Sequence, residues 1–349
     1  MIDSNLVKNA LNEHYDLAPS MEKAEATAAL YSKTSRVIPP ADWAVHAPYV
    51  LEINRLKREK NAVLLAHNYM TPEIYHGVAD FVGDSLQLAI KATEVTQDVI
   101  VQCGVHFMAE TSKILSPEKT VLIPDSAAGC SLAESITAKG VAEMRARYPG
   151  APVVSYVNTT AEVKAASDIC CTSSNAVQIV DAMEGDTVIM TPDQYLAQNV
   201  AAQSKKNVVW WAGSCIVHEE FTAEDLRAYR EFDPDTRILV HPECPPSVVA
   251  EADYTGSTSG IVNWVHKHKP AKAMLVTECS MAANIADELP EVEFVQPCNM
   301  CPYMKKITLE KILWSLHSMS EEVVVDRDVA DRARLAVERM IDLSKRLGL

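Results

Sequence analysis

Residues 63–92 read VLLAHNYMTPEIYHGVADFVGDSLQLAIKA, and two later stretches share their layout. These are VVSYVNTTAEVKAASDICCTSSNAVQIVDA at 153–182 and ILVHPECPPSVVAEADYTGSTSGIVNWVHK at 238–267. Each stretch opens with a short apolar run, which predicts a buried strand, and a short helical segment follows. A second strand then ends in a hydroxyl-rich turn ahead of another helix. The chain is therefore predicted to contain three copies of one α/β unit.

The similarity continues beyond each of these stretches. A third strand is predicted at 98–105, 186–192 and 272–278, and a helical segment follows each time. A fourth strand is predicted at 120–126, 207–214 and 292–298. Alternating strands and helices of this length are typical of a parallel sheet covered by helices. We expect an α/β fold of three αβα domains, each with a small parallel sheet, related by a pseudo-threefold axis around a central cavity.

The repeat also predicts the domain boundaries. Residues 1–47 form an N-terminal arm. The three αβα domains are predicted at 48–126, 127–213 and 214–301. The C-terminal helices at 302–349 end in an amphipathic segment near Asp328–Leu347, and we expect them to join the first domain.

Charge and hydropathy narrow the class of protein. The net charge of −15 argues against nucleic acid or an anionic membrane surface as a partner. No apolar run approaches the roughly 20 residues that cross a bilayer. The segment from Met1 to Lys23 mixes charged and polar residues throughout, unlike a secretory signal. We therefore expect a cytoplasmic protein.

Three of the nine cysteines occupy one position of the repeat, just after the fourth strand: Cys130, Cys215 and Cys301. In a reducing compartment this recurrence indicates a shared metal centre rather than disulfides. Three thiolates suit zinc or an iron–sulfur cluster. Structural zinc usually takes four protein ligands, commonly in close pairs, whereas a cubane with three cysteines leaves one iron open. The pattern favours the iron–sulfur cluster, and a Cys298–Cys301 redox couple is a secondary alternative.

The remaining cysteines have no counterparts in the other repeats, so we interpret them as structural: Cys103, Cys170, Cys171, Cys244 and Cys279.

Polar residues end the first strand of each repeat, where ligands of parallel sheets bind. The candidates are His67, Tyr69, Tyr156, Asn158, His241 and Glu243. Glu243 is the only carboxylate among them, which makes it the candidate general acid or base. Ser85, Ser173 and Ser257 stand in the hydroxyl-rich turns. We expect them to cap helices whose N-termini bind carboxylate or phosphate groups.

From about Leu51 onward the chain resembles the quinolinate synthase family. The matching stretches are LLAHNY, GDSL, FMAETSKILSPEK, CSLAE, SYVNTTAEVKA, TSSNAV, CIVHEEF, HPEC, GSTSG and CPYMKK. The resemblance implies a [4Fe–4S] cluster on Cys130, Cys215 and Cys301. It implies that iminoaspartate and dihydroxyacetone phosphate condense to quinolinate, with loss of phosphate and two waters. It also implies a functional link to L-aspartate oxidase.

The resemblance further assigns the site residues. Tyr69 matches an active-site tyrosine and, with His241 and Glu243, forms the expected catalytic set. The expected substrate-binding residues are His67, Ser85, Tyr156, Asn158, Ser173, His241, Glu243 and Thr258.

Three other functions fit the cysteine pattern alone. An iron–sulfur hydro-lyase would act on a hydroxy acid and ignore dihydroxyacetone phosphate. An iron–sulfur carrier or sensor would hold a transferable cluster and would leave His67, Tyr69 and Glu243 without a purpose. A zinc-stabilised binding protein would be recognised by metal analysis.

Overall fold

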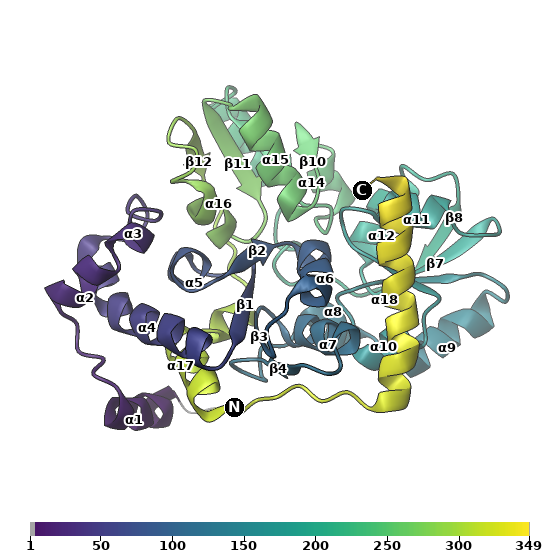
Figure 1. The fold of residues 1–349 in the computed structure, drawn as a ribbon. Coiled ribbons are helices and arrows are strands. Elements are labelled where there is room, and N and C mark those ends of the chain that lie inside the picture. The colour runs from purple at the N-terminus through teal and green to yellow at the C-terminus, as the bar shows by residue number, and fades with distance from the viewer. Residues whose placement is uncertain (1–3, 349) are drawn as a thin grey trace. The chain divides into compact units, whose positions relative to one another are not determined.

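A computed structural model describes residues 4–348 and separates them into two compact units (Figure 1). Unit 1 consists of residues 4–128, 279–292 and 300–324. Unit 2 consists of residues 129–278, 293–299 and 325–348. No helix in this described range is long and apolar enough to cross a membrane.

Three four-stranded parallel sheets form within residues 4–348, and all have the same strand order. The first, in unit 1, runs β2 (Phe81–Gly83), β1 (Ala62–His67), β3 (Val99–Cys103), β4 (Thr120–Leu122). The second runs β6 (Ile169–Cys171), β5 (Val153–Tyr156), β7 (Thr187–Thr191), β8 (Asn207–Trp210). The third runs β10 (Tyr254–Thr255), β9 (Arg237–Val240), β11 (Lys272–Val276), β12 (Glu293–Val295). This recurrence confirms the predicted α/β class.

The helices of unit 1 cover a strand that is buried along its whole length. All six residues of β1 are buried, as expected for a parallel strand with helices on both faces. The helices are α1 (Ser4–His14), α2 (Met21–Ala26), α3 (Ala28–Tyr31), α4 (Pro40–Glu59), α5 (Pro72–Gly77), α6 (Ser85–Glu94), α7 (His106–Leu115), α16 (Ser280–Ile285), the 3-10 helix η1 (Met304–Lys306) and α17 (Leu309–Ser318). The long helix α4 packs against β1, α2 and α17.

Unit 2 contains the second and third sheets. Its helices are α8 (Ser131–Ser135), α9 (Ala138–Arg147), α10 (Ala161–Ala165), α11 (Ala176–Asp181), α12 (Gln194–Ala201), α13 (Ala223–Phe232), α14 (Pro246–Val249), α15 (Thr258–His268) and α18 (Arg327–Leu347). Side chains of β9 and β11, among them Ile238, Val240 and Met274, form an apolar core with Phe221 and Leu226. This core holds the carboxyl ends of β9 and β11 in place.

The last helix corrects one expectation from the sequence. Helix α18 packs against α10 and β6 in unit 2, so it does not join the first domain (Figure 1). Its buried stripe includes Ala333, Val337 and Met340. The Nδ2 of Asn175 donates a hydrogen bond to the Oγ of Ser344 at 2.9 Å. An amphipathic pattern predicts that one helix face is buried but does not identify the surface that covers it.

Candidate active site

The backbone is fixed in a recurring way two residues before each predicted cluster cysteine. The N–H of His106 donates to the carbonyl of Ala128 at 2.7 Å, and that of Gln194 to Gly213 at 2.8 Å. Glu278 forms a parallel bridge with Asn299 at the corresponding place. Ala128, Gly213 and Asn299 precede Cys130, Cys215 and Cys301 by two positions. Each of the three cysteine segments therefore begins at an equivalent backbone contact.

Gly213 is required by this close approach. A Cβ added there would lie 2.6 Å from the carbonyl oxygen of Pro192. In this repeat a larger residue would therefore force the cysteine segment away from the strand end, although the other two repeats carry Ala128 and Asn299 at this position.

Two of the three predicted ligands are brought together in unit 2. The hydroxyl of Ser131, next to Cys130, donates to the carbonyl of Ser214 at 3.1 Å. The same Oγ accepts from the N–H of Ile216 at 3.2 Å. Ser214 and Ile216 are the two neighbours of Cys215, so Ser131 joins the Cys130 and Cys215 segments. Cys301 belongs to unit 1.

None of the nine cysteines forms a disulfide within residues 4–348, so the thiols of this site can serve as metal ligands. Cys130, Cys215 and Cys301 are partly buried, whereas Cys103, Cys170, Cys171 and Cys244 are buried in the core. Burial, the Glu243 charge and Cys130 together raise the pKa of the Cys215 thiol. A bound metal would offset this cost by stabilising the thiolate.

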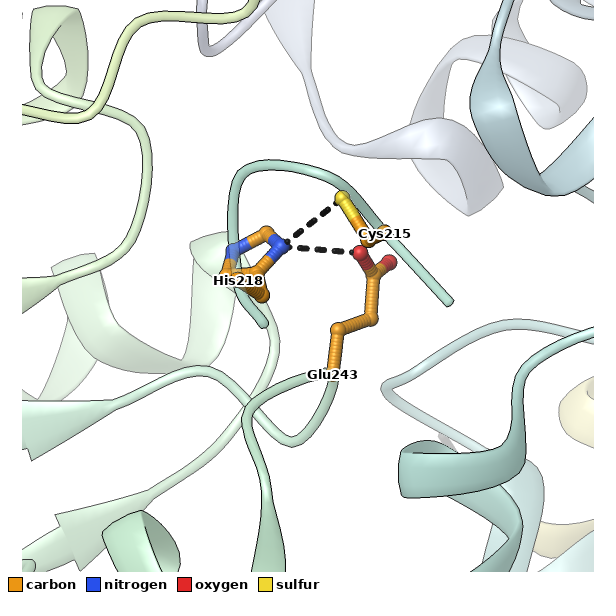
Figure 2. A group of neighbouring side chains, drawn as sticks. All are labelled: Cys215, His218 and Glu243. Atoms are coloured by element: carbon orange, nitrogen blue, oxygen red, sulfur yellow. Dashed lines mark hydrogen bonds and ion pairs between the residues drawn. The ribbon is translucent and has the colours of Figure 1, made fainter. Parts of the chain in front are cut away.

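Glu243 lies directly after β9 in a buried hydrogen-bond network. The hydroxyl of Tyr156 donates to its Oε1 at 2.5 Å. The Nδ1 of His218 lies 2.9 Å from its Oε2 and 3.2 Å from the Sγ of Cys215. Figure 2 shows one nitrogen of this imidazole facing both the carboxylate and the thiol. The network places a candidate acid–base group beside a candidate cluster ligand.

The network also assigns the protons of His218. Its Nδ1 faces a carboxylate, so Nδ1 carries the hydrogen. Its Nε2 lies 2.9 Å from the Oγ1 of Thr277, which anchors the other side of the ring. The ring of His241 stacks on it with centroids 4.7 Å apart. His218 is thereby fixed in orientation against Glu243.

Cys215, His218 and Glu243 place three ligand atoms within 4.8 Å of one another. Such a set has the composition of a three-ligand zinc site. However, the Nδ1 of His218 and the Oε2 of Glu243 are 2.9 Å apart, which is the distance of a direct hydrogen bond. The geometry therefore fits an acid–base network next to a thiolate better than a zinc site.

Two buried carboxyl groups of unit 2 have opposite electrostatic surroundings. Burial would raise the pKa of Glu243, but the His218 charge and hydrogen bond, His241 and Tyr156 together hold it below its usual range. Burial and the Glu243 charge raise the pKa of Asp193 well above its usual range, against two backbone hydrogen bonds. Glu243 is therefore ionised at neutral pH, whereas the surroundings of Asp193 favour its protonated form.

Asp193 is the N-cap of α12. Its Oδ1 accepts from the N–H groups of Tyr195 at 2.8 Å and Leu196 at 3.1 Å. Its Oδ2 is buried and has no hydrogen-bond partner within the described residues. A protonated carboxyl tolerates this position better than an ionised one.

In unit 1, His67 and Tyr69 repeat the arrangement of His241 and Glu243. The N–H of Tyr69 donates to the Nδ1 of His67 at 3.2 Å, and that of Glu243 to the Nδ1 of His241 at 3.3 Å. The rings of His67 and Tyr69 meet edge to face at 4.6 Å. Tyr69 and Glu243 thus occupy equivalent positions of the repeat.

The expected helix caps are correct in one of three cases. Ser257 caps α15, since its Oγ accepts from the N–H of Gly260 at 3.1 Å, and Thr258 is the first residue of that helix. Asp84 rather than Ser85 caps α6, in a capping box with Gln87.

At the third position Ser173 caps nothing, because α11 starts later, after Asn175. The Oδ1 of Asn175 accepts from the N–H of Thr172 at 2.6 Å and closes the hydroxyl-rich turn. In the same repeat, Asn158 is half-buried, and its Oδ1 has no partner among residues 4–348.

The structure thus groups the predicted residues by unit. Unit 1 holds His67, Tyr69, Ser85 and Cys301; unit 2 holds Cys130, Tyr156, Asn158, Ser173, Cys215, His241, Glu243 and Thr258. Sequence reasoning missed His218 and Asp193. His218 stands three residues after Cys215 in the stretch CIVHEEF, and that spacing was the available signal.

Comparison with known proteins finds one family and many close relatives. A family described as Quinolinate synthetase A protein matches residues 51–342. A quinolinate synthase of Sinorhizobium fredii is 60% identical, over 95% of this chain and 93% of its own length. A quinolinate synthase of Agrobacterium fabrum is 55% identical, over 95% of this chain and 96% of its own. One of Caulobacter vibrioides is 56% identical, over 91% and 88%.

Proposed function

This chain belongs to the quinolinate synthetase A protein family, and from that premise we propose that it makes quinolinate. The substrates are iminoaspartate and dihydroxyacetone phosphate, and phosphate and two waters leave. The observation that carries the proposal is Glu243, a buried ionised carboxylate held by Tyr156 and His218 beside Cys215. Such a group can move protons next to a metal-bound substrate.

A [4Fe–4S] cluster on Cys130, Cys215 and Cys301 is the cofactor in this proposal. The Ser131 contacts that join two of these segments support it. So does the equivalent backbone contact ahead of all three cysteines. When bound by three thiolates, such a cluster supplies an open iron that acts as a Lewis acid on a hydroxyl or carboxylate oxygen.

Glu243 serves as the general base of unit 2. It is ionised at neutral pH, the form that accepts a carbon-bound proton, and loss of its hydrogen bonds to Tyr156 or His218 would raise its pKa and its basicity. Tyr156 and His218 each hold one carboxylate oxygen, which fixes the direction of transfer. His241 stacks on His218 and is the third ring, after Tyr156 and His218, in the surroundings of Glu243.

Tyr69 is the matching proton donor of unit 1, and His67 packs against its ring. The proposed substrate-binding residues are His67, Ser85, Tyr156, Asn158, Ser173, His241, Glu243 and Thr258. Since Asp84 caps α6, the Ser85 hydroxyl is not used for capping. The N–H groups at the start of α6 and α15 favour anionic groups such as phosphate.

The remaining expectations complete the proposal. The repeats act as three domains, 48–126, 127–213 and 214–301, around a pseudo-threefold axis with a central cavity; the common strand order supports this. L-Aspartate oxidase is the proposed source of iminoaspartate. Nine cysteines without a disulfide among residues 4–348 support a reducing, cytoplasmic location.

The test is made on anaerobically purified protein. Iron, sulfide, zinc and the absorption spectrum are measured, and quinolinate is assayed with freshly generated iminoaspartate and dihydroxyacetone phosphate. We expect a cluster and quinolinate that forms only when both substrates are present. Turnover without dihydroxyacetone phosphate would indicate a hydro-lyase. A cluster that passes to an acceptor apoprotein, without turnover, would indicate a carrier, and zinc would indicate a binding protein.

A further inference from the structure

Two buried asparagines occupy the same position in two repeats. Asn199 lies in α12, six residues after Asp193, and Asn284 lies in α16, six residues after Glu278. Asp193 and Glu278 form the equivalent bridges ahead of the cysteine segments. Asn199 is 5% exposed and Asn284 is 1% exposed. Neither side chain reaches solvent, so their hydrogen bonds are made within the protein.

Asn199 holds the backbone on both sides of Glu243. Its Nδ2 donates to the carbonyl of Pro242 at 2.8 Å and to that of Cys244 at 3.0 Å. These are the residues immediately before and after Glu243. All of these residues belong to unit 2.

Asn284 holds the backbone on both sides of Tyr69 in the same way. Its Nδ2 donates to the carbonyl of Asn68 at 2.9 Å and to that of Met70 at 2.8 Å. The carbonyl of Tyr69 itself accepts from the Nζ of Lys305 at 2.9 Å. Three successive carbonyls around Tyr69 are therefore bound by side chains of unit 1.

The chemistry explains why an amide suits this position. A single Nδ2 carries two N–H donors in one plane, and each takes one carbonyl. Two carbonyl acceptors also fix which end of the amide faces the loop. Holding both flanking peptide groups sets the direction in which the Cα–Cβ bond of the enclosed residue points. A displacement of about 1 Å at a reacting group costs roughly a hundredfold in rate.

We propose that Asn199 and Asn284 are positioning residues for quinolinate formation, each fixing the backbone of one acid–base residue, Glu243 or Tyr69. The inference rests on the catalytic roles proposed above for those two residues. Neither asparagine contacts the reacting atoms in this account. Each acts through the residue it encloses, and that dependence can be measured.

The test is a double-mutant cycle with kcat, KM, iron content and thermal midpoint measured for every variant. We expect Asn199→Ala to lower kcat about 10- to 100-fold with KM changed less than about threefold. In a Glu243→Gln background the same change is expected to lower kcat less than about twofold, because the residue being positioned no longer transfers protons. In a Tyr69→Phe background, Asn199→Ala is expected to lower kcat by the same factor of about 10 to 100 as in the wild type. Asn284→Ala should give the converse pattern.

A matched control separates positioning from stability. Asn54 also donates from one Nδ2 to two carbonyls, those of Val50 and Gly77, each at 2.9 Å, but it encloses no site residue. Asn54→Ala is expected to lower the thermal midpoint and leave kcat within about twofold. If Asn199→Ala does not fold, Asn199→Gln keeps both donors one methylene further out, and its kcat loss enters the same cycle.

The outcomes separate the two levels of the proposal. If Glu243→Gln itself keeps near-wild-type turnover, its proposed catalytic role fails, and the role of Asn199 falls with it. If Glu243→Gln is impaired but Asn199→Ala lowers kcat equally in both backgrounds, the catalytic role stands and the positioning role is overturned. Loss of kcat in Asn54→Ala equal to that in Asn199→Ala would also overturn it.

Discussion

At the scale of single residues, the site depends on how each titratable group is surrounded. Glu243 and Asp193 are both buried, yet the pKa of the first is lowered and that of the second is raised. His218 and Tyr156 make the difference, because each donates a hydrogen bond to one oxygen of Glu243. Hydrogen bonds and neighbouring charges, rather than burial alone, therefore set the direction of each pKa shift.

The first prediction concerns the proposed acid–base pair. Glu243→Gln and Tyr69→Phe are expected to lower turnover by roughly 10²–10⁴, the usual effect of removing a general acid or base. Both changes keep the side-chain volume nearly constant, so iron content and substrate binding should persist. The measurement is quinolinate formation and iron content on the same samples. Near-wild-type turnover in Glu243→Gln would leave this residue a binding or structural role.

The second prediction concerns Asp193 and pH. The native state binds a proton on this carboxyl more tightly than the unfolded chain does, whose pKa is near 3.8. Stability therefore falls as pH rises above about 4, until the native-state pKa is reached. Asn is an equally good N-cap and carries no such charge.

We expect Asp193→Asn to raise the thermal midpoint, by an amount that grows as pH rises above about 4. Glu243 does not interfere, because its lowered pKa gives a contribution that is lost only as pH falls below the ordinary glutamate range. The exposed Asp235→Asn is the control, measured over the same pH range. A constant or shrinking difference for Asp193→Asn would show that this carboxyl is ionised in the native state.

At the scale of elements, the sequence predicts the strands and helices that recur in the three repeats, but it does not reveal residues that occur in only one repeat. The strands recur in three stretches, so the three parallel sheets could be predicted from spacing alone. The same spacing showed that Cys130, Cys215 and Cys301 occupy equivalent places in the repeats. His218 has no counterpart in the other repeats, and its partner Glu243 is distant along the chain. The pair Asn199 and Asn284 does recur, and an alignment of the third-strand helices would have found it.

Helix caps show the same limit at shorter range. Serine is a good N-cap, but so is the aspartate one residue earlier, and the backbone decides between them. In α6 the cap is Asp84, because its Oδ1 accepts from the N–H of Gln87 at 3.0 Å. In α15 it is Ser257. Residue type alone does not settle a one-residue shift of this kind.

The third prediction tests whether Asp84 rather than Ser85 is the N-cap of α6. Asp84→Ala is expected to destabilise the protein by about 1 kcal/mol, the usual cost of losing an N-cap. Ser85→Ala should leave stability nearly unchanged and weaken binding of dihydroxyacetone phosphate. Thermal midpoints and KM values on both variants test the distinction. A stability loss in Ser85→Ala as large as that in Asp84→Ala would return Ser85 to a structural role.

At the scale of the whole molecule, the cofactor is expected to depend on all three repeats. The fourth prediction is that Cys130→Ala, Cys215→Ala and Cys301→Ala each abolish iron retention, because three thiolates hold the cluster. Cys103→Ala is the matched control, since Cys103 is buried in β3. Iron and sulfide content after anaerobic reconstitution are measured. Full iron in Cys301→Ala, with loss in Cys298→Ala, would reassign the third ligand.

The position of α18 has a consequence for the order in which the protein is built. Strand β6 and α10 emerge from the ribosome long before residues 327–347, yet α18 packs against both of them. At about 5–20 residues per second, this delay lasts on the order of ten seconds. During that time the apolar surface meant for Val337 and Met340 stays open to water and to chaperones. The surface formed by α10 and β6 is therefore covered only after the C-terminal residues have been synthesised.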